Sequence, residues 1–333
     1  MRVLVCGSNY GATYIRALAA SQDNVRLAGI LSTGSARSMA YAHQAQVPHY
    51  TDVDSIPDGS IDIACVAVPG ETGNQLSLAL LSKGIHVLCE HPIGTAQMNK
   101  AFAVAKEYGR LFQVNAHFAD LLAPQAFYNG LSVAKHMGPP LHFDLAVNLR
   151  TLYSSLDIVG RALGSLADIQ VIAPPATGDS PPMFASLLLV SPTLHISLFC
   201  QNFASAADDG TATLLNHRCS ATFAHGNLLL AETNGPVIWF PSPVSMPIQQ
   251  WRNYLPVDMN QIDAHALQQQ RDHANRTVIN QMVAAIHGQA QTAHQQPTHQ
   301  QPTHQQPEYL LALASVWEQV LQALQPAFDQ ETA

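Results

Sequence analysis

The stretch that decides the fold is 1-MRVLVCGSNYGATYIRALAA-20, at the start of the chain. Residues 3–6 form an apolar run typical of a strand, and the turn at residues 7–11 separates it from a helical pattern. Glycines in such a turn let the backbone bend sharply and let a helix N-terminus approach a pyrophosphate, whose charge the N–H groups favour. The stretch therefore predicts the first strand, turn and helix of a dinucleotide-binding domain.

The same alternation continues to about residue 118. Four more apolar runs are separated by segments of helical period, at residues 25–31, 61–68, 86–89 and 111–114. This alternation predicts a parallel, doubly wound α/β sheet of the Rossmann type. The turn departs from the usual GxGxxG, because Asn9 and Ala12 occupy the second and third glycine positions and Gly11 comes one place early. A plain strand-to-helix turn is the alternative, but its position before four further strands favours dinucleotide binding.

After residue 118 the pattern changes. Helices are predicted at residues 119–136 and 153–163, and β-rich stretches follow at 184–190, 194–200 and 226–233. These segments predict an α+β domain built on an open, mainly antiparallel sheet. The chain is thus expected to contain a Rossmann domain over residues 1–118 and a second domain over residues 119–333.

The repeat near the C-terminus, at about residues 292–307, is rich in His, Gln and Pro. Its regularly spaced histidines suggest a metal site, but the segment has too little apolar surface to offset the entropy cost of ordering. We therefore interpret it as a disordered linker. A helix from about residue 308 to residue 324 is expected to pack back onto the body.

Composition limits the class of protein. The charged residues make up only 11% of the 333 residues, the formal net charge is -8, and Lys and Arg form no basic stripe, so nucleic-acid binding is not expected. No stretch reaches the roughly 18 apolar residues of a membrane span, and no signal peptide is recognised, so we expect a cytoplasmic protein. The cysteines have neither metal nor disulfide spacing and are expected to be reduced core thiols. They are Cys6, Cys65, Cys89, Cys200 and Cys219.

The end of the second predicted strand favours NADP over NAD. In NAD-binding domains a carboxylate at this place accepts a hydrogen bond from the ribose 2′-OH. The sequence 31-LSTGSARS-38 has no carboxylate and offers hydroxyls, a glycine and Arg37, which suit a 2′-phosphate. The alternative is a polar loop in which Ser35 caps the next helix. We predict that NADPH binds more tightly than NADH.

The tripeptide Glu90-His91-Pro92 follows the fourth predicted strand. Together with the variant glycine turn and the strand order, it resembles the glucose-fructose oxidoreductase (Gfo/Idh/MocA) family, in which the equivalent signature is Glu-Lys-Pro. More narrowly, the chain resembles the thiazolinyl imine reductases of yersiniabactin- and pyochelin-type siderophore biosynthesis, in which histidine replaces that lysine. The similar pieces span most of the chain and are 34-GSARS-38, 61-IDIACV-66, 90-EHP-92, 152-LYSSLD-157 and 235-GPVIW-239.

The resemblance implies an NADPH-dependent reductase that works with a nonribosomal peptide synthetase. Its substrate would be a thiazoline ring tethered to a carrier protein, and reduction of the C=N bond would give a thiazolidine. The alternatives are another NADP-dependent imine or carbonyl reductase of the same superfamily, and a non-catalytic NADP-binding sensor. A homodimer is the default expectation, because an uncovered apolar face of the second domain's sheet needs a partner.

Reduction of a C=N bond needs a hydride for the carbon and a proton for the nitrogen. His91 is our first candidate for the proton donor, because an imidazole titrates near neutral pH and this segment lies at the carboxyl end of a strand. His117 and an ordered water are the other candidates. Tyr153 and Asp157 are four residues apart on one face of a predicted helix, where a substrate contact and a plain hydrogen-bonded helix are equal alternatives.

Two positions depart from what the resemblance implies. The tyrosine considered as a proton donor just after the fifth strand is Phe118 in this chain. The wider family's histidine, four residues after the helix aspartate, is Arg161, which argues against a sugar alcohol as the substrate.

The residues expected to bind the coenzyme lie at the ends of the predicted strands. Glu90 is expected to support the coenzyme or its loop rather than to react. No metal ligand is expected. The coenzyme-binding set is Gly7, Ser8, Asn9, Tyr10, Gly11, Ser32, Thr33, Ser35, Arg37, Ser38, Val68, Pro69, Glu90, His91 and Asn115.

Overall fold

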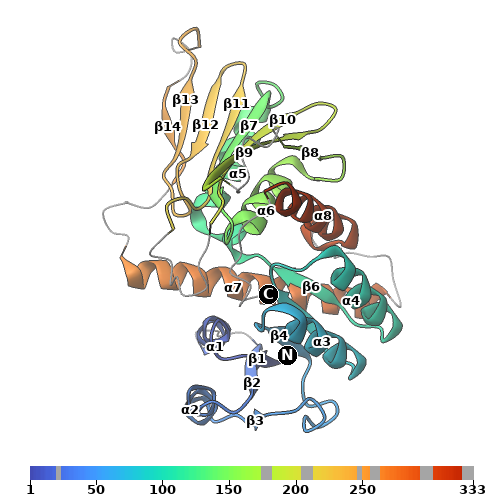
Figure 1. Ribbon diagram of the computed structural model, residues 1–333. Helices are drawn as coiled ribbons and strands as arrows, with labels where there is room; N and C mark the ends of the chain where they lie inside the picture. The colour runs from blue at the N-terminus through green and yellow to red at the C-terminus, as the bar shows by residue number, and fades with distance from the viewer. Residues whose placement is uncertain are drawn as a thin grey trace. The chain divides into compact units, whose positions relative to one another are not determined.

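The computed structural model describes residues 1–19, 24–173, 182–203, 213–245, 250–255, 263–292 and 303–324. The chain forms two compact units. The first comprises Met1–His117 and Gln268–Leu311, and the second comprises Phe118–Leu267 and Ala312–Ala333. Each unit is built on a sheet of its own (Figure 1).

The first unit contains a six-stranded parallel sheet in the order β3-β2-β1-β4-β5-β6. This is the order of a doubly wound dinucleotide-binding fold, so the predicted α/β class is confirmed. Its strands are β1 (Arg2–Cys6), β2 (Arg26–Leu31), β3 (His49–Tyr50), β4 (Ile63–Val66), β5 (His86–Glu90) and β6 (Phe112–Asn115). The helices that connect them are α1 (Gly11–Ala19), α2 (Ala36–Ala45), α3 (Gly70–Ser82) and α4 (Thr95–Glu107).

A long helix from late in the chain, α7 (Ala264–Thr292), completes the core of the first unit. Its residues Val278, Ile279 and Met282 are buried in one cluster with Val3 and Ile63 of the strands. The buried positions recur at three- and four-residue intervals, so α7 presents an apolar stripe although the rest of its surface is polar. The prediction that all of residues 119–333 form the second domain therefore differs from the structure, in which residues 268–311 cluster with the first unit.

The last part of the His/Gln/Pro repeat is also ordered. Thr303–Gln305 forms the 3-10 helix η3, and Gln305 is 1% exposed. Its side-chain amide accepts a hydrogen bond from the Val114 N–H (3.1 Å) and donates one to the Val114 carbonyl (2.9 Å), on the edge strand β6. The prediction of disorder is therefore wrong for residues 303–307 and for Thr292, the last residue of α7, whereas residues 293–302 lie outside the described residues. Helix α8 (Pro307–Leu324) agrees with the predicted C-terminal helix.

The second unit contains an eight-stranded sheet in the order β14-β13-β12-β11-β7-β10-β9-β8. Only the β7–β10 pair of this sheet is parallel, so the predicted mainly antiparallel α+β domain is confirmed. Its strands are β7 (His142–Asn148), β8 (Gln170–Ile172), β9 (Phe184–Val190), β10 (His195–Gln201), β11 (Arg218–Phe223), β12 (Gly226–Leu230), β13 (Val237–Pro241) and β14 (Arg252–Asn253).

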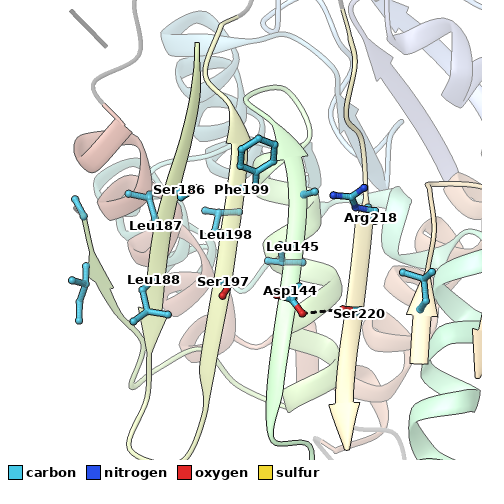
Figure 2. Close-up of a pocket in the computed structure, with 14 residues that line it drawn as sticks. Asp144, Leu145, Ser186, Leu187, Leu188, Ser197, Leu198, Phe199, Arg218 and Ser220 are labelled. Carbon is cyan, nitrogen blue, oxygen red and sulfur yellow. Dashed lines mark hydrogen bonds between the residues drawn. The ribbon is translucent and has the colours of Figure 1, made fainter. Parts of the chain in front are cut away.

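Helices cover one face of this second sheet. These are α5 (Leu122–Lys135), which packs on β12 and β13, and α6 (Leu152–Leu163), which packs on β7 (Figure 1). Gly130 allows α5 to approach closely, because a Cβ there would lie 2.9 Å from a methyl of Leu228. The opposite face carries exposed side chains, including Asp144 and Phe199 (Figure 2).

All five cysteines are buried and form no disulfide, as predicted. Across the described ranges, no helix combines the length and the apolar character that crossing a membrane requires.

Candidate active site

The glycine turn after β1 has the shape of a coenzyme cradle. Gly7 has a φ of 88°, and a Cβ at this position would lie 2.9 Å from the Ala67 carbonyl oxygen, so a larger residue does not fit. Gly11 begins α1, and a Cβ there would lie 3.1 Å from a methyl of Val5. Gly11 therefore provides the close packing of helix on strand that the third glycine of GxGxxG normally provides. The residues present fit a dinucleotide at this turn.

The turn lies where the strand order reverses, between β1 and β4, which is where open α/β sheets bind ligands. The Val68 side chain approaches Gly7 across this point, and Pro69 is the residue before α3. Asn9 is exposed, whereas Ser8 is 8% exposed and its Oγ lies 3.5 Å from Ser35 Oγ. The structure thus brings the predicted residues that follow β1, β2 and β4 to one edge of the sheet.

The loop after β2 is well defined by its own hydrogen bonds. Ser35 is the N-cap of α2, and its Oγ accepts a hydrogen bond from the Ser38 N–H (3.2 Å), so the helix-capping interpretation is confirmed. Ser38 is fully buried and donates from Oγ to the Ser35 carbonyl (2.8 Å). Thr33, Ser35 and Arg37 are exposed, and Ser32 is half-buried. These four side chains are accessible to a ligand, whereas the buried Ser38 is not.

His91 follows β5 and is joined to Pro92 by a cis peptide bond. Its Nδ1 lies 2.8 Å from the Asn115 carbonyl oxygen and 3.1 Å from Glu90 Oε1. Because a carbonyl oxygen only accepts, Nδ1 carries a hydrogen in this arrangement.

Glu90 is the centre of a buried polar network. Its Oε2 accepts hydrogen bonds from the Tyr14 hydroxyl (2.5 Å) and from Asn115 Nδ2 (3.1 Å). Asn115 Nδ2 also donates to Asn275 Oδ1 on α7 (2.6 Å). Burial, followed by the Glu90 carboxylate, raises the pKa of Tyr14, so that residue stays a neutral donor. Glu90 and the Asn115 carbonyl thus both contact His91 Nδ1, within a network that also includes Tyr14 and Asn275.

His117 lies beside the same carboxylate. It is 1% exposed, its Nδ1 is 2.9 Å from the Tyr10 hydroxyl, and Glu90 Oε1 is 4.0 Å from the same nitrogen. Burial raises the pKa of Tyr10, so its phenol keeps its hydrogen at neutral pH. The two candidate histidines of the first unit therefore share Glu90 as their nearest carboxylate.

Tyr153 and Asp157 belong to the second unit, on α6. Tyr153 is buried against Trp317, with ring centroids 5.8 Å apart. Asp157 Oδ2 lies 2.9 Å from Nη2 of Arg161, the residue at the position of the wider family's histidine. Arg161 also binds Asp120 Oδ2 at 3.0 Å. These contacts fit the hydrogen-bonded helix alternative for Asp157.

Phe118, at the place where the resemblance implies a tyrosine, stacks on His217 with ring centroids 4.6 Å apart. The two His217 ring nitrogens lie 2.7 Å from Ser154 Oγ and 2.8 Å from Thr233 Oγ1. His217 is buried and both of its nitrogens face hydroxyls, so it connects α6 to the turn that follows β12.

Sequence reasoning missed Tyr14 and Asn275. Tyr14 on α1 follows Tyr10, the residue before the helix, by four residues, a spacing that brings the two rings to within 6.2 Å and was available as a signal. Asn275 gave no signal, because its helix was not predicted.

Two family comparisons match the two parts of this architecture. Residues 1–116 match the oxidoreductase family with an NAD-binding Rossmann fold (Gfo/Idh/MocA). Residues 139–240 match the C-terminal domain of thiazolinyl imine reductases of the Irp3-like type. One region of the chain is thus similar to Gfo/Idh/MocA NAD-binding domains, and a second region is similar to Irp3-like C-terminal domains. No curated protein sequence matches the chain.

Solved structures share the whole fold at low sequence identity. An oxidoreductase from Agrobacterium radiobacter, in complex with NAD+, L-tartaric acid and magnesium, is 12% identical with a TM-score of 0.70, over 96% of this chain and 94% of that one. KijD10, a 3-ketoreductase from Actinomadura kijaniata in complex with NADP, is 17% identical with a TM-score of 0.67, over 96% of both chains. UDP-N-acetylglucosamine 3-dehydrogenase GnnA from Acidithiobacillus ferrooxidans is 15% identical with a TM-score of 0.69, over 97% of both chains. These similarities establish the fold.

Proposed function

We propose that this chain is an NADPH-dependent thiazolinyl imine reductase of siderophore biosynthesis. Its substrate is a thiazoline held on a carrier protein of a nonribosomal peptide synthetase, and its product is the thiazolidine. The observation that carries the proposal is the match of residues 139–240 to the thiazolinyl imine reductase C-terminal domain. The histidine at position 91, in place of the lysine of the wider family, supports the same assignment.

The first unit would hold the coenzyme. The Gly7 turn and the first turn of α1 would receive the pyrophosphate, and the exposed Thr33, Ser35 and Arg37 would receive the ribose end. NADPH supplies the hydride that adds to the imine carbon. The absence of a carboxylate from the 31-LSTGSARS-38 loop supports NADPH rather than NADH.

His91 would supply the proton to the imine nitrogen. Its Nδ1 is engaged by the Asn115 carbonyl, so Nε2 of the imidazolium is the nitrogen that would give up its proton. The neutral ring left behind keeps its Nδ1 hydrogen and its bond to Asn115. Solvent would then return a proton to Nε2. His117, beside the same carboxylate, is the second candidate.

The uncovered face of the second sheet is the proposed homodimer surface. It is hollowed by about 700 Å³ and lined by apolar side chains together with Asp144 and Arg218 (Figure 2). In a twofold dimer the patch of one subunit meets the same patch of the other. The acidic group and the basic group of the patch can then each face the opposite charge of the other subunit.

The test is consumption of NADPH with a small thiazoline, compared with a ketone and a sugar substrate. Turnover of the thiazoline alone is the expected result. Turnover of only the carbonyl compound would assign the chain to the other reductases of the superfamily. Coenzyme binding without turnover of a thiazoline carried on its synthetase carrier protein would assign it to the sensors.

A further inference from the structure

His49 lies next to the loop that follows β2. It is the first residue of β3, which pairs in parallel with β2 and sets His49 opposite Ile30. His49 is therefore at the carboxyl end of the sheet, beside residues 32–38. Its ring reaches the side chains of Ser32 in the loop and Ser38 in the first turn of α2.

The hydrogen bonds of Ser38 fix the protonation of this ring. Ser38 Oγ gives its single hydrogen to the Ser35 carbonyl at 2.8 Å. Towards His49 Nε2, at 3.2 Å, Ser38 can then only accept, so that nitrogen carries a hydrogen. The same Nε2 lies 3.0 Å from Ser32 Oγ and donates to it as well.

The hydrogen bond from His49 limits the hydrogen bonds that the Ser32 hydroxyl can still make. Its oxygen accepts from His49 Nε2 and from the Gly34 N–H (3.3 Å), which uses both of its lone pairs. Only the hydroxyl hydrogen is left to meet a ligand, and no acceptor for it is found among the described residues. Ser32 is thereby limited to donating.

A side chain that can only donate hydrogen bonds suits one coenzyme better than the other. The 2′-phosphate of NADP offers oxygens that only accept, whereas the 2′-OH of NAD is normally read by a group that accepts its hydrogen. The guanidinium of the exposed Arg37, in the first turn of α2, can also only donate hydrogen bonds. Ser32 and Arg37 therefore offer hydrogens to a phosphate, and neither of these two side chains offers an acceptor to a hydroxyl.

We propose that His49 determines the coenzyme selectivity of this chain, by turning the Ser32 hydroxyl into an obligate donor towards the 2′-phosphate of NADPH. His49 acts through Ser32 and is a positioning residue. The inference rests on the proposed function, because it assigns the origin of the preference for NADPH.

The experiment compares dissociation constants of NADPH and NADH for the full chain and its variants by titration. In His49→Leu the Ser32 oxygen regains a lone pair, so we expect NADPH to bind about tenfold more weakly while NADH binding stays within about twofold. His49→Gln keeps an N–H donor and is expected to restore most of the NADPH-to-NADH ratio. His43→Leu, an exposed histidine on α2, is the matched control and is expected to retain the full ratio.

An unchanged ratio in His49→Leu, or an equal weakening of both coenzymes, overturns the inference and leaves the proposed reductase in place. Wild-type protein that binds NADH as tightly as NADPH overturns both the inference and the proposed coenzyme preference. Thermal melting shows whether His49→Leu is folded. Should it unfold, Ser32→Ala replaces it and is expected to show the same selective loss of NADPH affinity.

Discussion

Among the individual residues, His91 and His117 lie on either side of one carboxylate, that of Glu90. His91 Nδ1 also contacts a backbone carbonyl oxygen, that of Asn115, at 2.8 Å. This contact orients the imidazole ring and identifies Nδ1 as the nitrogen that is held by the backbone. The arrangement gives His91 the geometry of an oriented acid.

Replacing His91 by Asn is expected to lower kcat about 100-fold, because a positioned acid contributes about 10²- to 10⁴-fold to such a step. The dissociation constant of NADPH should stay nearly unchanged, since the coenzyme turn does not depend on the imidazole. Steady-state kinetics and coenzyme titration check both values, with the exposed His136→Asn as a control. Turnover that falls by no more than a few-fold would mean that solvent supplies the proton.

His86 makes the free energy of unfolding depend on pH, and the direction of this dependence can be predicted. Burial, followed by the Arg110 charge, lowers the pKa of His86 from 6.5 to about 4, and its Nδ1 accepts a hydrogen bond from the Leu111 N–H at 2.9 Å. Above pH 6.5 the ring is neutral in both the folded and unfolded chain, so its contribution is fully present. Between pH 6.5 and 4 only the unfolded chain takes up the proton, and the free energy of unfolding falls.

His86→Asn retains an acceptor near the Nδ1 position but does not titrate. We expect the variant to lose less stability than the wild type over this range, by roughly 1–2 kcal/mol, because solvent screens this partly exposed ring. Urea unfolding at several pH values measures the difference. The control is His43→Asn, which is expected to keep the pH dependence of the wild type. If His86→Asn keeps this pH dependence as well, the assignment to His86 is contradicted.

Single-residue roles were predictable from sequence where a motif carried them. Glu90 and His91 stand in a recognisable tripeptide, and their position at a strand end predicted their place in the fold. The partners Tyr14 and Asn275 were not predicted, because hydrogen bonds between residues far apart in sequence depend on side-chain directions that no local pattern specifies.

For the secondary-structure elements, the turn between β1 and α1 provides the sharpest test of the coenzyme site. Gly7→Ala places a Cβ 2.9 Å from the Ala67 carbonyl at a φ of 88°. We expect loss of about 2 kcal/mol or more of stability and strongly weakened coenzyme binding, because the backbone must shift to relieve the contact.

Gly59→Ala is the matched control for this change. Gly59 also has a positive φ, of 66°, but nothing lies within 4 Å of its added Cβ. It should cost about 1 kcal/mol by its backbone conformation alone and leave coenzyme binding intact. Thermal melting and NADPH titration distinguish the two. Equal coenzyme affinities in both variants would remove the turn from the coenzyme site.

The predicted strands of the first unit all form, because each is a short apolar run that the sheet buries. Helix α7 escaped prediction because its sequence is mostly Gln, His and other polar residues, and only a narrow stripe is buried. Gln305 escaped for a related reason. Composition favours disorder in a Gln- and Pro-rich repeat, but one amide that pairs with a strand edge is enough to order its end.

For the molecule as a whole, the proposed dimer gives the clearest prediction. Phe199 is 39% exposed on the uncovered face of the second sheet and stacks on Phe184, with ring centroids 5.5 Å apart. Phe199→Asp places a charge in this surface and is expected to convert a dimer to a monomer, because burying an unpaired carboxylate is costly. Light scattering after gel filtration measures the mass.

Val133→Asp is the control for this prediction, since Val133 is a comparably exposed apolar residue on α5. It should leave the dimer intact. A Phe199→Asp protein that remains a dimer would move the interface elsewhere, and a monomeric wild type would remove the dimer from the proposal.

The class of both domains could be predicted because it follows from the order of short local patterns, strand after helix and then strand after strand. Which residues belong to which unit could not be predicted from the sequence. Residues 268–311 cluster with the first unit because the core of its sheet needs a cover, and this need is visible only when the strands are folded.

Helix α7 also sets the order in which the protein is completed during synthesis. A ribosome produces Val3 and Ile63 early, whereas Val278 and Met282, which share their core cluster, emerge more than two hundred residues later. Until then the nascent chain carries an apolar surface without its cover, a state prone to aggregation. The domain whose translation starts first is thus among the last to mature.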